Sequence, residues 1–205
     1  MRNSLTTFAL AGLLVAVPPL ASAQSPSQPP PRQDAPKESK AAKEPKNGKI
    51  ARGDEKFMKD AAVGGMTEVK LGQLAEQKAA SDGVKQFGRR MATDHGRAND
   101  ELKQLASQKG VALPMDLDRS HQGLYDKLAK LNGADFDRAY MKEMVKDHDK
   151  DVKAFRKQAD SGKDPDVKSW ASKTLPTLQE HQQQAKQVAA GLQGKGSPAA
   201  SPAQK

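Results

Sequence analysis

Four long segments between residues 54 and 192 carry apolar residues at alternating steps of three and four. This spacing places the apolar residues on one face of an α-helix. The breaks between the segments have the residues of helix ends: Gly110 and Gly162 follow two of them, and Asp164-Pro165 opens the last. Amphipathic helices of this length bury their apolar faces against one another. The sequence therefore predicts an all-α protein.

The lengths of the connections predict how these helices are joined. The first and second helices, and the third and fourth, are separated by only a few residues, so each pair forms an antiparallel hairpin. The connection between the hairpins exceeds twenty residues and holds a short amphipathic segment near residues 117–131. It is long enough to travel the length of a bundle. We expect a ferritin-like antiparallel four-helix bundle with one long crossover containing a short helix. The expected long helices span about residues 54–80, 81–109, 134–161 and 165–192.

The N-terminus has the features of a secretory signal peptide. Arg2 precedes an apolar run from Phe8 to Val17, and the small residues Ala21-Ser22-Ala23 follow. The run is too short to cross a bilayer, which takes about 18 to 20 apolar residues. We expect cleavage after Ala23 and export of a soluble protein to the periplasm, with outer-envelope association left open.

Differences in amino-acid composition separate the expected disordered segments from the bundle domain. The segment before the bundle is rich in proline, lysine and serine, as is typical of disordered regions, and the chain has no cysteine to form a disulfide. The predicted organisation is a signal peptide (1–23), a disordered basic linker (24–52), a four-helix bundle domain (53–192) and a disordered tail (193–205).

The net charge of +9 is concentrated outside the bundle. Residues 53–190 hold 24 basic and 22 acidic groups, a surplus of only two. A basic groove for phosphates is therefore not expected, and we predict no nucleic-acid partner. The linker has seven basic and three acidic residues, which predicts at most a weak electrostatic contact with anionic envelope surfaces. The sequence leaves the oligomeric state open.

One titratable residue lies on the apolar face of each long helix. These residues are Glu68, His95, His148 and His181. Each is within about three residues of the midpoint of its predicted helix, which corresponds to less than about 5 Å of helical rise. The middle of a helix is at the same level whichever way the helix runs. The four side chains are therefore expected to meet in one buried layer.

Two interpretations of this layer stay open. Three imidazoles and one carboxylate form a donor set suited to one ion of zinc, iron, copper or nickel, with Asn99, Asp151 and Gln184 placed to orient the rings. In the alternative, Glu68 accepts hydrogen bonds from the histidines, and a metal-free polar network specifies the register of the bundle.

Other residues beside the layer are open to two readings each. Gly64-Gly65 and Pro176 weaken their helices close to the layer, either for a functional reason or as tolerated irregularities. Met91 and Met144 precede two of the histidines by one turn, a position compatible with copper(I) ligands, and are interpreted as core residues. No nucleophile paired with a base and no phosphate-binding loop is found, which favours a binding protein over an enzyme without deciding the question.

Four runs of residues resemble the bacterial domain-of-unknown-function 4142 family. They are AAVGGMTEVKLG at 61–72, MATDH at 91–95, FDRAYM at 136–141 leading to His148, and LPTLQEH at 175–181. The resemblance covers residues 54 to 190. It implies a ferritin-like helical domain exported to the periplasm or outer envelope of a Gram-negative bacterium, with no established activity.

The wider ferritin-like group implies a di-iron centre, which these residues do not fit. Di-iron bundles place a glutamate three residues before two of their histidines. Ala92 and Leu178 occupy those positions, and His148 stands where a bridging glutamate is expected. We expect a mononuclear metal site used in envelope metal or oxidative-stress handling. The alternative is a non-enzymatic structural or partner-binding module.

Overall fold

The computed structural model describes residues 50–194 of the chain, with side chains to residue 193. Five helices occupy this range: α1 (Arg52–Lys78), α2 (Asp82–Lys109), α3 (Arg119–Ala129), α4 (Gly133–Ser161) and α5 (Pro165–Gly194). None of these helices is long and apolar enough to cross a membrane. The predicted signal peptide, nearly all of the linker, and the tail from residue 195 lie outside the described residues.

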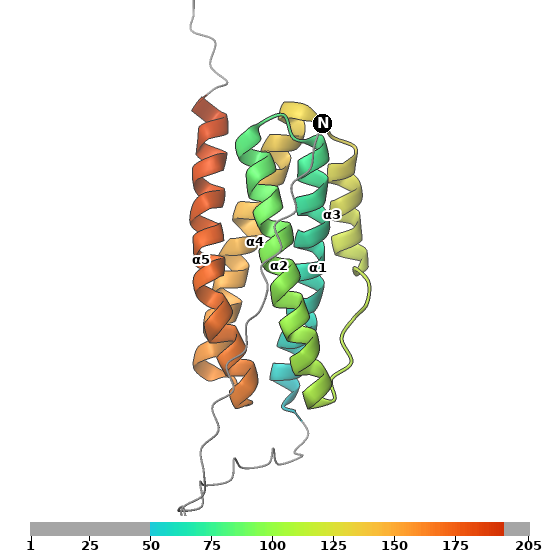
Figure 1. Cartoon of the computed structure of the whole chain (residues 1–205), viewed down its shortest axis with the longest axis vertical. Helices are drawn as coiled ribbons and strands as arrows, with labels where there is room; N and C mark the ends of the chain where they lie inside the picture. The colour runs from blue at the N-terminus through green and yellow to red at the C-terminus, as the bar shows by residue number, and fades with distance from the viewer. Residues whose placement is uncertain (1–49, 195–205) are drawn as a thin grey trace, which may run out of the picture. The chain divides into compact units, whose positions relative to one another are not determined.

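Helices α1, α2, α4 and α5 form an antiparallel bundle. Helix α1 packs beside α2 and α4, and α5 packs beside the same two helices. Figure 1 shows α1 and α5 running in one direction and α2 and α4 in the other. The chain returns along the bundle after α2, and α3 packs mainly on α1 within this crossover (Figure 1). The prediction of an all-α, ferritin-like bundle with a helix in its crossover is confirmed.

A buried carboxylate on α4 fixes the loop of the first hairpin. Asp137, which is 2% exposed, lies in the first turns of α4. Its carboxylate accepts hydrogen bonds from the backbone N–H groups of Ala80, at 3.1 Å, and Ser81, at 2.9 Å. These groups lie at the start of α2, where backbone donors have no partner within the helix. The second hairpin therefore caps a helix of the first.

The reverse arrangement holds the second hairpin. Asp54, also 2% exposed, accepts hydrogen bonds from the backbone N–H of Asp164 at 2.7 Å and from the Gln158 side chain at 2.7 Å. The expectation that α1 starts at residue 54 is thereby corrected. Ala51 occupies the N-cap position of α1, and the Asp54 side chain serves the loop before α5 instead. Asp164 does cap α5, because its carboxylate accepts from the backbone N–H of Val167 at 3.1 Å.

Two apolar clusters fill the bundle on either side of its middle. The first includes Phe87, Met91 and Met144, which confirms that these methionines are core residues. The second includes Phe155 and Trp170. Along all four long helices, the predicted polar residues fall between the positions of the two clusters. The polar layer therefore interrupts an otherwise apolar core.

Glycines allow α1 and α2 to approach closely beside this layer. A Cβ atom added at Gly72 would lie 2.4 Å from the carbonyl oxygen of Gly88, and one at Gly65 would lie 2.2 Å from Oδ1 of Asn99. A side chain at either position would force neighbouring atoms to move. A Cβ at Gly64, in contrast, would meet nothing within 4 Å. Only Gly65 of the Gly64-Gly65 pair is thus required by packing.

Candidate metal centre

The structure brings the four predicted site residues together from four different helices. Glu68 lies on α1, His95 on α2, His148 on α4 and His181 on α5. His95 is 6% exposed, and the other three residues are fully buried. The ring centroid of His95 lies 5.8 Å from that of His148 and 5.3 Å from that of His181. The centroids of His148 and His181 are 5.4 Å apart. One nitrogen from each ring lies within 4.8 Å of the other two, so the three rings can share one ion.

Glu68 lies against two of these rings. Its Oε2 is 2.7 Å from Nε2 of His95, and its Oε1 is 3.3 Å from Nδ1 of His148. Neither contact has the alignment of a hydrogen bond, and both carboxylate oxygens lack a hydrogen-bond partner. Ligand atoms about 2.1 Å from a tetrahedral ion lie about 3.4 Å from one another. The 2.7 Å contact is shorter than this spacing, so it fits an ion pair between Glu68 and a protonated His95 better than two ligands of one tetrahedral ion.

In two of the histidine rings, one nitrogen makes a hydrogen bond that orients the ring and the other nitrogen has no hydrogen-bond partner. His148 donates from Nδ1 to the backbone oxygen of Met144, at 2.9 Å, and its Nε2 is buried without a partner. His181 donates from Nε2 to Oδ2 of Asp94, at 2.9 Å, and its Nδ1 is buried without a partner. Histidines that bind a metal through one nitrogen commonly donate from the other to a carboxylate or a backbone carbonyl. Both rings have this arrangement.

Burial and charge set the protonation of the layer. Burial alone would raise the pKa of Glu68, but His148 and His95 outweigh it and lower that pKa to about 2. Burial lowers the pKa of His181 to about 4, against the effect of the hydrogen bond that its ring donates to Asp94. His181 is therefore neutral near pH 7, and the carboxyl of Glu68 is ionised. These are the states in which both groups can bind a metal ion.

Two further carboxylates lie on the other side of Glu68. Asp147 and Asp151, both on α4, each place one oxygen within 4.8 Å of a Glu68 oxygen. Burial raises the pKa of Asp147 and raises that of Asp151 well above its usual range, and the charge of Glu68 adds to both shifts. Asp151 was expected to orient a ring, whereas the prediction did not include Asp147. Their four-residue spacing on one helix face was the signal available in the sequence.

The residue that orients His181 was not predicted from the sequence. Gln184 was expected near this ring but instead accepts a hydrogen bond from Arg90, at 3.0 Å. Asn99 packs its side chain against the Gly65 backbone. Asp94 orients His181 across the contact between α2 and α5. It directly precedes His95, and only the packing of two distant helices shows its role.

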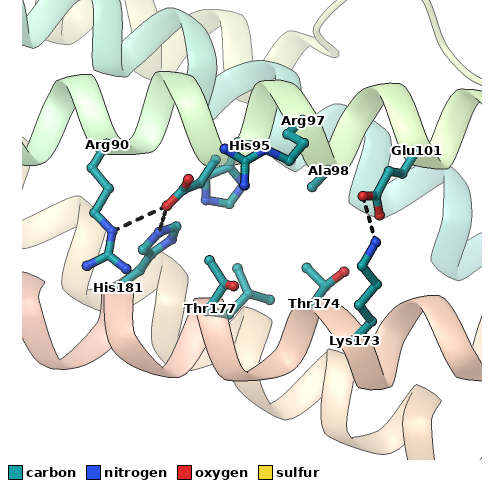
Figure 2. A pocket seen from close by; sticks show the side chains of 11 residues that line it. Arg90, His95, Arg97, Ala98, Glu101, Lys173, Thr174, Thr177 and His181 are labelled. Carbon is teal, nitrogen blue, oxygen red and sulfur yellow. Dashed lines mark hydrogen bonds and ion pairs between the residues drawn. The ribbon is translucent and has the colours of Figure 1, made fainter.

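A pocket of about 180 Å³ opens between α2 and α5 beside the layer, and we call it the α2–α5 pocket. Figure 2 shows it from close by. The rings of His95 and His181 form part of its wall. The lining also includes the exposed side chains of Arg97 and Lys173 and two threonines of α5. The polar layer is therefore reached from the surface on this side.

The bundle and its buried group of three imidazoles, with Glu68 against two of them, define a ferritin-like helical protein with a candidate metal centre. The chain belongs to the DUF4142 family, a domain of unknown function, whose profile matches residues 39–188. This membership confirms the resemblance of the four sequence runs. Comparison with curated proteins finds no match.

Solved structures with the same fold include three from different proteins. A DUF305 fragment from Deinococcus radiodurans has a TM-score of 0.62 at 11% identity, covering 70% of this chain and 99% of its own. CopM in its Cu(II)-bound form has a TM-score of 0.58 at 20% identity, covering 67% and 96%. The conserved hypothetical protein Rv2844 from Mycobacterium tuberculosis has a TM-score of 0.53 at 16% identity, covering 74% and 97%. At these identities the likeness shows the fold alone.

Proposed function

We propose that this protein binds one transition-metal ion through His95, His148 and His181, with Glu68 as the fourth ligand. The observation that carries the proposal is the set of buried atoms without hydrogen-bond partners: Nε2 of His148, Nδ1 of His181 and both oxygens of Glu68. A buried polar atom left unpaired costs about 1 to 3 kcal/mol. A single cation between the rings would satisfy Nε2 of His148 and Nδ1 of His181 together, and the ionised Glu68 beside two of the rings would balance its charge.

Copper(II) is the first ion to consider. Imidazole nitrogens bind copper(II) more tightly than zinc, nickel or iron(II), following the general order of divalent affinities. The copper-bound form of CopM, a bundle of the same fold, supports the same choice. The signal-peptide pattern in residues 1–23 supports a location in the periplasm. The proposed role is envelope metal handling, in which the ion is buffered or protected from unwanted redox reactions.

The close contact of Glu68 with His95 favours a second candidate function. A protonated His95 paired with ionised Glu68 balances the charge of the layer without a metal ion, since Glu68 raises the pKa of His95 against the effect of burial. In this case the layer specifies the register of the four helices, and the protein is a structural or partner-binding module of the envelope.

Metal analysis and titration distinguish these functions. Protein purified from its native periplasm is analysed for bound metals, and chelator-treated protein is then titrated with copper(II) and zinc while the bound metal is counted. We expect one tightly bound ion in the wild type and its loss in His148→Ala. His121→Ala is the matched control. Of the four histidines in the sequence, His121 is the one outside the layer, and it lies on α3 paired with Asp118. Equal uptake by both variants, or no uptake by the wild type, contradicts the proposal.

A further inference from the structure

We propose that the α2–α5 pocket admits a small inorganic anion that binds directly to the metal ion held by the polar layer. This inference rests on the proposed function and adds to it an exchangeable ligand. Copper(II) has a tetragonal geometry that extends beyond four positions, so four protein ligands leave room for an exchangeable one. The pocket provides the route to such a position.

The first argument is access. The α2–α5 pocket is lined by both His95 and His181, so it ends against two of the rings that would hold the ion. His95 is also the one member of the polar layer with measurable exposure, at 6%. Apolar clusters close the bundle on the two sides of the layer along its axis. The α2–α5 pocket is therefore the larger of two pockets that reach His95 from the side of the bundle; the other has about 80 Å³ and lies near Gly65 and Asp151.

The second argument is charge. The pocket lining holds three cationic side chains (Arg90, Arg97 and Lys173) and two carboxylates (Asp94 and Glu101). Arg90 and Lys173 are neutralised by ion pairs, to Asp94 at 3.3 Å and to Glu101 at 2.7 Å. Arg97 makes no hydrogen bond or ion pair with any residue in the described range 50–193. Its unpaired charge adds to that of the metal ion, and this field attracts anions.

The third argument is a hydrogen-bond donor with no partner. Figure 2 shows Thr174 and Thr177 on α5, on the side of the pocket opposite α2. The Thr174 hydroxyl already donates to the backbone oxygen of Trp170, at 2.8 Å. The Thr177 hydroxyl makes no hydrogen bond within the described residues, so it can donate to an anion in the pocket. A threonine hydroxyl and a guanidinium are both suited to hold an oxygen or nitrogen anion.

The size of the pocket sets the class of ligand. A volume of about 180 Å³ accommodates a few heavy atoms beside the ion, together with water. Ala98 and Leu178 add an apolar wall, which disfavours multiply charged, strongly hydrated anions. The ligand class is therefore a small monovalent anion, and azide is the probe because its bond to copper(II) gives a charge-transfer absorption band.

The experiment titrates azide into the copper-loaded full chain and follows this band. We expect saturation at one azide per copper in the wild type. Arg97→Ala removes the unpaired charge and is expected to weaken azide binding by about 3- to 10-fold. Thr177→Val removes the hydroxyl at nearly constant volume and is expected to weaken binding by a similar factor. Arg89→Ala is the matched control, because Arg89 is an exposed arginine of α2 outside the pocket lining and its loss leaves the azide affinity unchanged.

Copper binding is measured first for every variant, so that the two proposals fail separately. Wild-type protein that takes up no copper overturns the proposed function and this inference with it. Protein that binds copper but shows no azide band overturns the inference alone. The same conclusion follows if Arg97→Ala and Arg89→Ala bind azide with equal affinity and Thr177→Val matches the wild type.

Discussion

Nε2 of His181 lies 2.9 Å from Oδ2 of Asp94, while the other nitrogen of the same ring is buried without a hydrogen-bond partner. The carboxylate fixes which nitrogen carries the proton and which presents a lone pair to the layer. Asp94 in turn is held by Arg90, at 3.3 Å. This chain of contacts crosses from α2 to α5 and makes the geometry of the polar layer dependent on the packing of the two helices.

Replacing Asp94 tests this dependence. Asp94→Ala removes the acceptor of the His181 N–H, and we expect the affinity for copper(II) to fall by about 10- to 100-fold. Asp94→Asn retains an oxygen acceptor and is expected to lie between Asp94→Ala and the wild type. The measurement is competitive titration against a chelator of known affinity. Asp100→Ala, an exposed aspartate of the same helix, is the control. Identical affinities for Asp94→Ala and Asp100→Ala contradict the assigned role of Asp94.

Thermal unfolding with and without metal tests whether the ion binds the folded state. An ion at a hundredfold excess over its Kd stabilises the fold by about 2.7 kcal/mol. For a domain of this size the Tm is expected to rise by roughly 5 to 10 °C. His148→Ala removes one ligand, so its Tm is expected to be nearly independent of metal. A wild-type Tm that does not respond to copper(II), zinc, nickel or iron(II) contradicts metal binding by the layer.

Adjacent glycines of α1 are expected to respond in opposite ways to substitution by alanine. Gly64→Ala gains helix propensity of about 1 kcal/mol without a clash, because a Cβ there meets nothing within 4 Å. Gly65→Ala places a Cβ 2.2 Å from Oδ1 of Asn99 and is expected to destabilise the protein by about 1 to 3 kcal/mol. Urea unfolding of both variants measures the two changes. Stabilisation by both substitutions shows that Asn99 moves away at little cost.

Acid is expected to destabilise the metal-free protein through His181. Its pKa is about 4 in the folded protein, against the ordinary histidine value of 6.5 that applies in the unfolded chain. Between these values the unfolded chain binds a proton that folded His181 does not bind, so stability falls as the pH falls. From about pH 7 to about pH 5 the expected loss from this group is about 2 kcal/mol. Urea unfolding at both pH values measures the loss.

Two neighbouring groups act in other pH ranges. Glu68, with a pKa of about 2 against an ordinary 4.5, contributes stability that is lost only as the pH falls below about 4.5. The pKa of His95 is raised by Glu68 against the effect of burial, so its contribution is lost as the pH rises above 6.5. His181→Gln removes the titrating ring, so comparing this variant with the wild type isolates the contribution of His181 to the pH dependence of stability. An unchanged pH dependence in this variant contradicts the assignment, and His121→Gln is the control.

Local patterns in the sequence were sufficient to predict most of the fold. Helix spacing, glycine breaks and the Asp164-Pro165 start predicted the long helices to within about three residues of their observed ends. These signals act over one or two helical turns, so they are present in the sequence itself. The connection lengths then left few topologies. The start of α1 was misjudged because Asp54 has the residue type of a cap but accepts hydrogen bonds from a loop more than a hundred residues away.

The sequence by itself determined which residues meet in the polar layer, because Glu68, His95, His148 and His181 share both the buried face and the midpoint of their helices. Only the tertiary structure decided how they meet. The rotation of each helix about its axis sets which ring nitrogen faces the layer and places Asp94 beside His181. The separation of α2 from α5 opens a pocket on the layer. These quantities depend on the packing of side chains from distant parts of the chain, and helical periodicity carries no information about them.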